Sequence, residues 1–190
     1  MLKIFTDGST FNNGKKNAVG GIGIYIPKLI YKLSLQYLLD TATNQRCELY
    51  AIVRALELVL SLILEEKIEE NEIVIYTDSE YSINACTKWI KQWKINNWKT
   101  SQKKPVANVH FIIAIDNMLS IFKMNSVLIK FQHIRSHQNP PKNSSSEEYE
   151  NWKGNDIADK LALTATKILD SKIKKAKFSK PVTVKSFSSK

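Results

Sequence analysis

The order of apolar patterns along the chain limits the folds that it can adopt. Three apolar runs, at residues 2–6, 19–27 and 30–39, are typical of strands, and turn-length segments connect them. A long helical pattern follows at residues 43–67, and two further strand-like runs then alternate with helical ones. This order predicts an α/β fold, in which a five-stranded mixed sheet has three antiparallel strands followed by two parallel strands and is flanked by helices.

The second half of the chain supplies the parallel strands and their helical connections. Its expected elements are a strand at 72–79, a helix that begins at 79, a helix at 106–122, a strand at 126–137 and a helix at 155–169. A basic segment with several aromatic residues spans residues 88–108. The polar segment 138–154 contains prolines and serines, and we expect it to be an exposed, mobile loop.

The length and charge of the chain limit its organisation and its partners. A chain of 190 residues suffices for one domain with a hydrophobic core. We predict a folded domain at residues 1–169 and a disordered basic tail at residues 170–190, which are rich in lysine and serine. The formal net charge of +10 favours polyanionic partners such as nucleic acids, although a basic surface can also be simply solvated.

The N-terminus lacks the basic segment and the long apolar run of a signal peptide. No apolar stretch is long enough to span a bilayer. Cys47 and Cys86 fall within expected helices and are typical of small buried apolar residues in a reducing compartment. We therefore expect an intracellular protein of the cytoplasm or the nucleus that is not secreted and has no membrane partner.

Four acidic residues occupy positions where elements begin or end. Asp7 and Asp78 each follow a strand-like run, and the ends of adjacent strands in such sheets carry functional residues. Glu48 lies early in the long helix and Asp159 in the first turns of the last helix, where the helix dipole favours an ionised carboxylate. Taken singly, each acid has an ordinary alternative role, as a turn cap or as a first-turn acid.

Taken together, the four acids indicate a metal site. Carboxylate oxygens are suitable ligands for Mg²⁺ or Mn²⁺ and not for zinc. Two such ions about 4 Å apart can activate a water molecule and stabilise the leaving oxygen of a phosphodiester.

Four stretches of sequence support a comparison with a known family: TDGS at 6–9, TNQRCELYA at 43–51, YTDSEY at 76–81 and GNDIADKLA at 154–162. Their order and spacing resemble those of the ribonuclease H type 1 family. The resemblance extends from Leu2 to Leu169, and the segment 89–108 resembles the basic protrusion of bacterial and animal members. It implies a ribonuclease H-like fold and an endoribonuclease that hydrolyses the RNA strand of RNA/DNA hybrids, leaving 5′-phosphate and 3′-hydroxyl ends.

The resemblance also implies catalytic roles for individual residues. It implies that two Mg²⁺ ions, for which Mn²⁺ is a substitute, are held by Asp7, Glu48, Asp78 and Asp159. His137 matches a histidine on a flexible loop that assists turnover by proton shuttling or product release. Serine precedes this histidine here, where the family usually has glycine.

The resemblance further implies contacts to both strands of a hybrid. The expected RNA-strand contacts are Asn13, Asn44 and Gln45. The expected DNA-strand contacts are Tyr81, Trp89, Trp93 and Ser101, with Thr43 and Asn108 forming a phosphate pocket. Thr41 stands where animal members commonly have arginine. Aromatic residues at helical spacing are usually part of a core, but interleaved lysines at 88, 91 and 94 favour a partly exposed groove.

Asp156 and Asp159 are both available as the fourth acidic ligand. If Asn155 or Asp156 caps the last helix, Asp156 has a structural role and Asp159 faces the sheet end that carries Asp7. The family pattern also places the catalytic acid at Asp159.

Three other classes of protein share parts of this pattern. A nucleic-acid-binding module without activity would lack at least one of the four acids, and none is missing. A transposase-like or integrase-like enzyme shares the fold and the acidic pattern, but the basic protrusion and Glu48 argue against it. A ribonuclease H domain of a reverse transcriptase also fits. We expect a monomer without an obligate protein partner.

Overall fold

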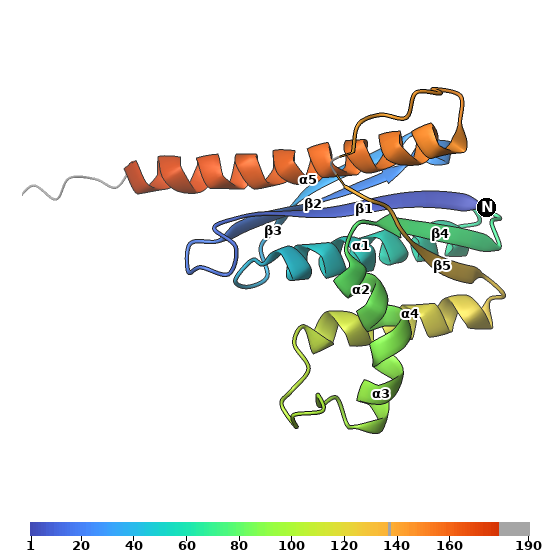
Figure 1. Ribbon diagram of the computed structural model, residues 1–190, viewed down its shortest axis with the longest axis horizontal. Coiled ribbons are helices and arrows are strands. Elements are labelled where there is room, and N and C mark those ends of the chain that lie inside the picture. The colour runs from blue at the N-terminus through green and yellow to red at the C-terminus, as the bar shows by residue number, and fades with distance from the viewer. Residues whose placement is uncertain (137, 179–190) are drawn as a thin grey trace, which may run out of the picture.

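The computed structural model describes residues 1–136 and 138–178, which form one five-stranded mixed sheet with helices on both faces (Figure 1). The strand order is β3-β2-β1-β4-β5. The strands are β1 (Leu2–Phe11), β2 (Val19–Ile26), β3 (Tyr31–Tyr37), β4 (Glu72–Thr77) and β5 (Leu128–His133). The first three strands are antiparallel, and β4 and β5 run parallel to β1. The predicted fold class is confirmed.

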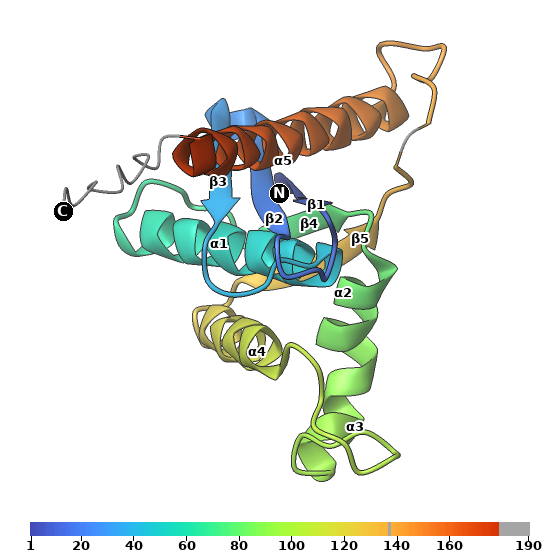
Figure 2. The same cartoon turned by 90° about the vertical axis from the view of Figure 1, so that its left-hand side faces the viewer.

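Helices cover the two faces of the sheet unequally. The helical elements are η1 (Pro27–Leu29), α1 (Asn44–Leu64), α2 (Glu80–Asn84), the π-helical turn η2 (Ala85–Trp89), α3 (Ile90–Ile95), α4 (Val109–Met124) and α5 (Glu147–Phe178). Helix α5 packs across β1, β2 and β3 on one face, whereas α1 and α4 lie on the other face (Figure 2). The sequence predicted one helix from residue 79. The structure divides it into α2, η2 and α3, which lead away from the sheet (Figure 2).

The main core lies between the sheet and α1. Alternate residues of β1 and β2, such as Ile4 and Ile22, pack there with the apolar side of α1. A smaller cluster on the other face stacks Phe5 on Tyr76 beside Ala158 of α5, with ring centroids 4.9 Å apart. Both cysteines are buried, as predicted.

Strand β1 is longer than the sequence predicted. It pairs with β4 only as far as Phe5 opposite Tyr76, but it continues beside β2, where Asp7 lies opposite Gly23. The antiparallel partner supplies the hydrogen bonds that carry the strand past the Asp-Gly pair to Phe11. Asp7 therefore lies inside a strand and not at its end, although it does lie beyond the part that β4 covers.

Two glycines allow helices to approach the sheet closely. A Cβ atom on Gly8 would lie 2.6 Å from the carbonyl carbon of Cys47 and closer still to the Glu48 amide, so only glycine lets the start of α1 reach β1. A Cβ atom on Gly23 would likewise collide with the α5 backbone at Ala158. These two contacts set the positions of the helices that carry acidic residues.

Helix α5 begins earlier and ends later than the sequence predicted. The Ser146 hydroxyl accepts the Tyr149 amide at 3.1 Å, and three glutamates lie in the first turn, so the helix has a favourable N-terminus at Glu147. At the other end residues 170–178 are helical, although the predicted disordered tail included them. Lysine and alanine favour helix there, and Asp170 forms an ion pair with Lys174 one turn later. Residues 179–190 lie outside the described part.

Candidate active site

Three of the four predicted acidic residues converge on one point. Asp7 comes from β1, Glu48 from the second turn of α1, and Asp78 from the residue after β4. A carboxylate oxygen from each lies within 4.8 Å of one from each of the others. Asp159 of α5 joins them in the wall of a cleft of about 530 Å³, which we call the acidic cleft.

Glu48 is held in place by the strands beside it. The Gly8 amide donates to Glu48 Oε1 at 2.9 Å, and the Thr77 hydroxyl lies 3.4 Å from Oε2. The Thr77 oxygen also accepts the Ser79 amide at 3.1 Å, which fixes the chain on the far side of Asp78. Glu48 is 7% exposed and Asp7 is 6% exposed, so these carboxylates occupy a largely buried site.

The electrostatics of this cluster oppose ionisation when no cation is bound. Burial raises the pKa of Asp7 to about 8, and the charges of Asp78 and Asp159 act in the same direction. Burial also raises the pKa of Glu48 well above its usual value, as do the charges of Asp7 and Asp78, while hydrogen bonds from Gly8 and Thr77 oppose the shift. Closely spaced carboxylates of this kind are a suitable set of hard oxygen ligands for a divalent cation.

The position of Asp159 within α5 differs from the predicted one. Because α5 begins at Glu147, Asp156 and Asp159 lie several turns inside the helix and away from its positive end. Neither Asn155 nor Asp156 is an N-cap, and Asn155 is instead buried within α5. Asp156 Oδ2 accepts a hydrogen bond from Lys160 Nζ at 2.6 Å, whereas Asp159 is close enough to Asp7 to raise its pKa.

The predicted RNA-strand residues lie beside the acidic cleft. Asn44 and Gln45 line this cleft and also a neighbouring pocket of about 620 Å³. Asn13, from the loop after β1, lines the second pocket, and its side-chain oxygen accepts the Asn44 amide at 3.1 Å. Thr43 and Asn108 line the second pocket as well, so the structure places both groups of predicted contact residues next to each other.

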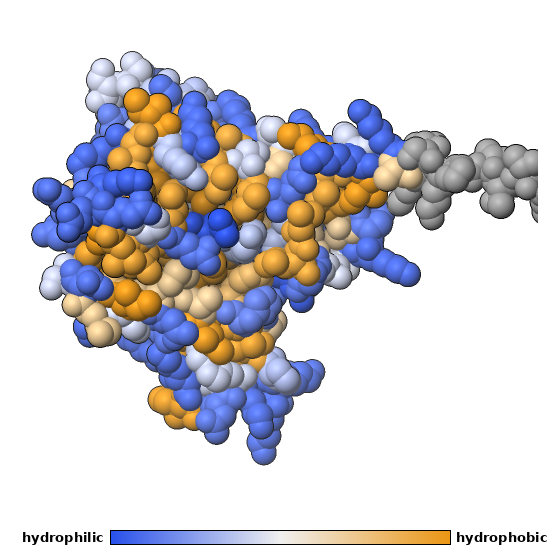
Figure 3. Space-filling model, turned by 180° about the vertical axis from the view of Figure 1, so that it is seen from behind, coloured by the Kyte–Doolittle hydropathy of each residue, from blue (hydrophilic) through white to orange (hydrophobic). Residues whose placement is uncertain are grey.

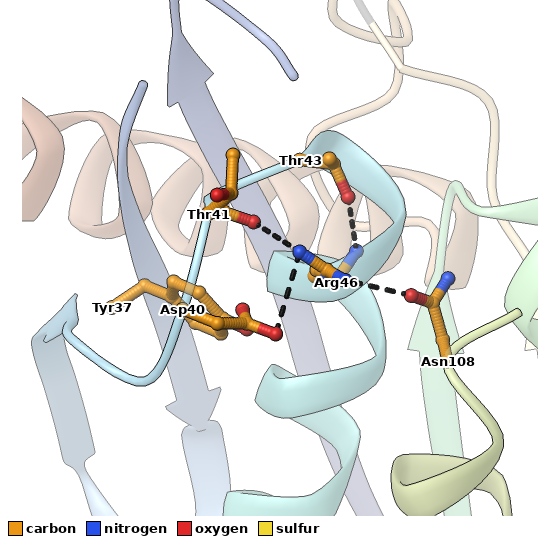
Figure 4. Close-up of polar contacts among 6 residues, drawn as sticks. All are labelled: Tyr37, Asp40, Thr41, Thr43, Arg46 and Asn108. Atoms are coloured by element: carbon orange, nitrogen blue, oxygen red, sulfur yellow. Dashed lines mark hydrogen bonds and ion pairs between the residues drawn. The ribbon is translucent and has the colours of Figure 1, made fainter. Parts of the chain in front are cut away.

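An arginine that the sequence analysis left without a role lies in this second pocket (Figure 4). Arg46 donates from Nη1 to the Thr41 carbonyl at 2.6 Å and from Nε to Asn108 Oδ1 at 3.2 Å. Its Nη1 also lies 3.3 Å from Asp40 Oδ2, and the Tyr37 hydroxyl donates to the other oxygen of Asp40. Thr41 therefore contributes only its backbone carbonyl to the second pocket, and the positively charged side chain of this pocket is Arg46 of α1.

The position of Arg46 could have been inferred from the start of α1. The Thr43 hydroxyl accepts the Arg46 amide at 3.2 Å and caps the helix. A residue three positions after the cap lies in the first turn, where its long side chain can reach the loop before the helix. The TNQR stretch contains this signal, but it does not indicate that the left-handed backbone of Asn108, with φ 57°, brings its side chain within reach.

The predicted aromatic residues form a row from α2 to α3. The rings of Tyr81 and Trp89 are 5.9 Å apart, and those of Trp89 and Trp93 are 5.7 Å apart. Trp89 is 41% exposed, while Tyr81 and Trp93 are half-buried. The Asn108 side chain donates to the Tyr81 hydroxyl at 3.3 Å, which connects this aromatic row to the second pocket. Ser101 lies in the exposed loop after α3.

Comparison with known proteins identifies the family. The sequence profile of the RNase H family matches residues 1–167. The chain belongs to the ribonuclease H family. It is 36% identical to ribonuclease H of Clostridium botulinum over 160 residues, which cover 84% of this chain and 91% of that protein.

Solved structures of ribonuclease H proteins have the same fold. The RNase H domain of prototype foamy virus is 26% identical, has a TM-score of 0.64, and the match covers 88% of this chain and 94% of that one. An RNase H1 solved with an RNA/DNA hybrid is 21% identical, has a TM-score of 0.56, and the match covers 89% and 99% of the two chains. The second similarity shows the fold alone.

Two residues of this ribonuclease H need separate mention. His137 lies outside the described residues, so its predicted role in turnover stays a prediction. His133, which the sequence analysis did not select, ends β5 with Nε2 3.1 Å from the Asp78 carbonyl and so supports the backbone that carries this acid.

Within the described residues, no helix is both long enough and apolar enough to span a membrane.

Proposed function

We propose that this ribonuclease H hydrolyses the RNA strand of RNA/DNA hybrids endonucleolytically and leaves 5′-phosphate and 3′-hydroxyl ends. The observation that carries the proposal is the acidic cleft, in which Asp7, Glu48 and Asp78 lie within 4.8 Å of one another and Asp159 lines the same wall. The relative solved with an RNA/DNA hybrid shows that this fold accommodates such a substrate.

The cofactor that fits this cleft is a pair of Mg²⁺ ions, with Mn²⁺ as a substitute. Asp7, Glu48, Asp78 and Asp159 are the residues that would hold them. When bound, two such ions supply an activated water and stabilise the leaving oxygen. The chain itself fixes the ligand set: the Gly8 amide and the Thr77 hydroxyl orient Glu48, and the β1–β4 pairing sets the spacing between Asp7 and Asp78.

The surfaces beside the cleft provide a means of distinguishing the two strands. Asn13, Asn44 and Gln45 offer short amide groups, which suit the 2′-hydroxyls of an RNA strand. The aromatic row offers ring faces for the sugars or bases of the DNA strand. Ser101, which follows the row in the sequence, offers a hydroxyl group for a phosphate of the same strand.

The second pocket suits a DNA phosphate. Thr43 and Asn108 supply polar groups there, and Arg46 supplies a guanidinium. Arginine matches the geometry of phosphate oxygens well.

We further propose that the enzyme acts as a monomer in a reducing intracellular compartment, without an obligate protein partner. Cys47 and Cys86 are both free and buried, which supports the reducing compartment.

The test of the proposed function is a cleavage assay with four labelled substrates: an RNA/DNA hybrid, duplex RNA, duplex DNA and single strands. We expect cleavage of the RNA strand of the hybrid alone, and only with Mg²⁺ or Mn²⁺ present. Equal cleavage of duplex DNA would contradict the substrate assignment, and full activity in excess chelator would contradict the metal assignment.

A further inference from the structure

Helix α5 continues past the sheet that it covers. It has 32 residues, and Figure 1 shows its C-terminal turns projecting beyond the strands and the loop after β1. Up to residue 176, Leu169 is the last buried residue of the helix, and residues 171–176 are all exposed. Hydrophilic side chains project above and below the described end of α5 in the view from behind (Figure 3). The packing of the domain therefore does not account for these last turns.

The projecting part of the helix is strongly basic. Residues 167–178 contain five lysines and one aspartate. Basic helices attract phosphate backbones and gain affinity by releasing condensed counterions. If this helix end were simply solvated, its lysines would need no particular arrangement. Their positions relative to the acidic cleft therefore help to distinguish a binding surface from a solvated one.

One row of lysines begins beside the acidic cleft. Leu163 lines this cleft together with Asp159, and Lys167 follows Leu163 by four residues, so it is the next neighbour along the same side of the helix. Lys160 and Lys174 stand seven residues before and after Lys167, which is close to two helical turns. We call Lys160, Lys167 and Lys174 the lysine row.

The lysine row is exposed and its existing ion pairs are weak. The side chains of Lys160 and Lys174 are 69% and 68% exposed, and each pairs with an aspartate four residues earlier on the same helix. Exposed pairs of this kind contribute little to stability. Both ammonium groups can therefore exchange their carboxylate for a phosphate at low cost. Lys167 is also exposed.

We propose that the lysine row binds the sugar-phosphate backbone of the part of the hybrid that extends beyond the acidic cleft. This inference rests on the proposed action on hybrids. The distance along the helix from Asp159 to Lys174 is about 22 Å, which corresponds to about six base pairs of duplex. The α2–α3 protrusion stands on the opposite side of the molecule from α5 (Figure 2), so a hybrid in the cleft would have basic side chains on both sides.

The chain offers a matched control for this proposal. Lys172 and Lys175 lie on the same exposed end of α5, but they point to a different side of the helix from Lys167 and Lys174. The double variant Lys167→Ala/Lys174→Ala and the control Lys172→Ala/Lys175→Ala therefore remove equal charge from the same segment. Alanine favours helix, so both variants should keep α5 intact, which circular dichroism checks.

The experiment measures KM and kcat on two hybrids with central cleavage sites, one of about eight base pairs and one of about 24. The short hybrid then extends about four base pairs beyond the cleft, less than the distance to Lys174, so only the longer one reaches the end of the row. We expect the Lys167→Ala/Lys174→Ala variant to raise KM several-fold for the long hybrid, with kcat unchanged and no effect on the short hybrid. The dependence of log KM on log salt should decrease by about one for each lysine removed. The control variant should have a clearly smaller effect.

Three results would overturn the proposal. An equal effect of the control would mean that only the total charge matters, and an equal effect on both hybrids would mean that the row does not contact the flanking duplex. If Lys167→Ala/Lys174→Ala lost binding only to duplex RNA and not to the hybrid, the row would bind a different polyanion. Failure of the unmodified enzyme to cleave either hybrid would instead contradict the proposed function, so the two failures are distinguishable.

Discussion

In the acidic cleft, Asp7 and Glu48 are less than one-tenth exposed, and strands and backbone amides hold them in place. In the second pocket and the aromatic row, Trp89 is 41% exposed, and Arg46 relies on partners from a loop and from the N-cap of α4. The cleft combines these two buried carboxylates with the half-buried Asp78 and Asp159. A change at the buried positions should affect stability and chemistry together. The contact surface is built from exposed and half-buried positions, where changes should affect binding more than stability.

The largest expected effect distinguishes two neighbouring acids of α5. Asp159→Asn removes a carboxylate from the cleft, so turnover should fall by at least about a hundredfold. Mutation of a residue that only hydrogen-bonds to a metal ligand already lowers metal affinity or activity by about ten to a hundredfold. Asp156→Asn loses only the ion pair with Lys160, whose ammonium group is exposed, and should leave turnover nearly unchanged. Steady-state rates at fixed Mg²⁺ decide the matter, and an inactive Asp156→Asn variant would show that the assignment of the fourth acid is wrong.

A smaller effect tests how closely the cleft is packed. Gly8→Ala places a methyl group against the Cys47–Glu48 backbone, so we expect a loss of about 1–3 kcal/mol in the free energy of unfolding, together with reduced turnover. Gly14→Ala is the control, because nothing lies within 4 Å of its added Cβ and only the strain at φ +71° remains. Denaturant unfolding measures both variants, and equal stability of Gly8→Ala and the unmodified protein would contradict the close approach.

The aromatic row should separate binding from stability. Trp89→Ala should weaken hybrid binding by roughly 1–3 kcal/mol with a smaller change in stability than Trp93→Ala, because Trp89 is 41% exposed. Trp93→Ala should weaken binding and also lower the melting temperature, because Trp93 packs against the main core. If both variants unfold alike, the row belongs to the core and not to the contact surface.

The smallest expected effect concerns the ion pair in the second pocket. Asp40→Asn removes the carboxylate that competes with a phosphate for Arg46, so hybrid affinity should rise a few-fold at low salt. Fluorescence anisotropy at two salt concentrations measures the change, which should shrink at high salt. Weaker binding by Asp40→Asn would show that Asp40 positions Arg46 and does not compete for it.

The sequence predicted the sheet and the meeting of three acids because both depend on local patterns. Strand periodicity and element order determine which strand ends lie together, so Asp78 could be placed next to Asp7. The extension of β1 through Asp7 could not be predicted, because it depends on hydrogen bonds to β2, which is distant in sequence. The start of α5 depends on the Ser146 cap, which resembles an ordinary polar loop residue. The position of Arg46 depends on Asn108, 62 residues away.

The most direct test of the acidic cleft is thermal unfolding between about pH 4 and pH 8, with and without Mg²⁺. The pKa of Asp7 is about 8 in the folded protein and about 3.9 when unfolded. The folded state therefore binds more protons in this window, and stability falls as pH rises through it. Mg²⁺ binds the deprotonated cluster, so it should stabilise the protein most at pH 8 and flatten this dependence.

Asp78→Asn provides the comparison, because the Asp78 charge raises the pKa of Asp7 and the other titrating groups are shared. We predict that the fall in stability without Mg²⁺ is smaller in Asp78→Asn, and that Mg²⁺ changes this variant much less than the unmodified protein. Identical pH profiles for the two proteins, unaffected by Mg²⁺, would contradict the account of the cleft as a metal site.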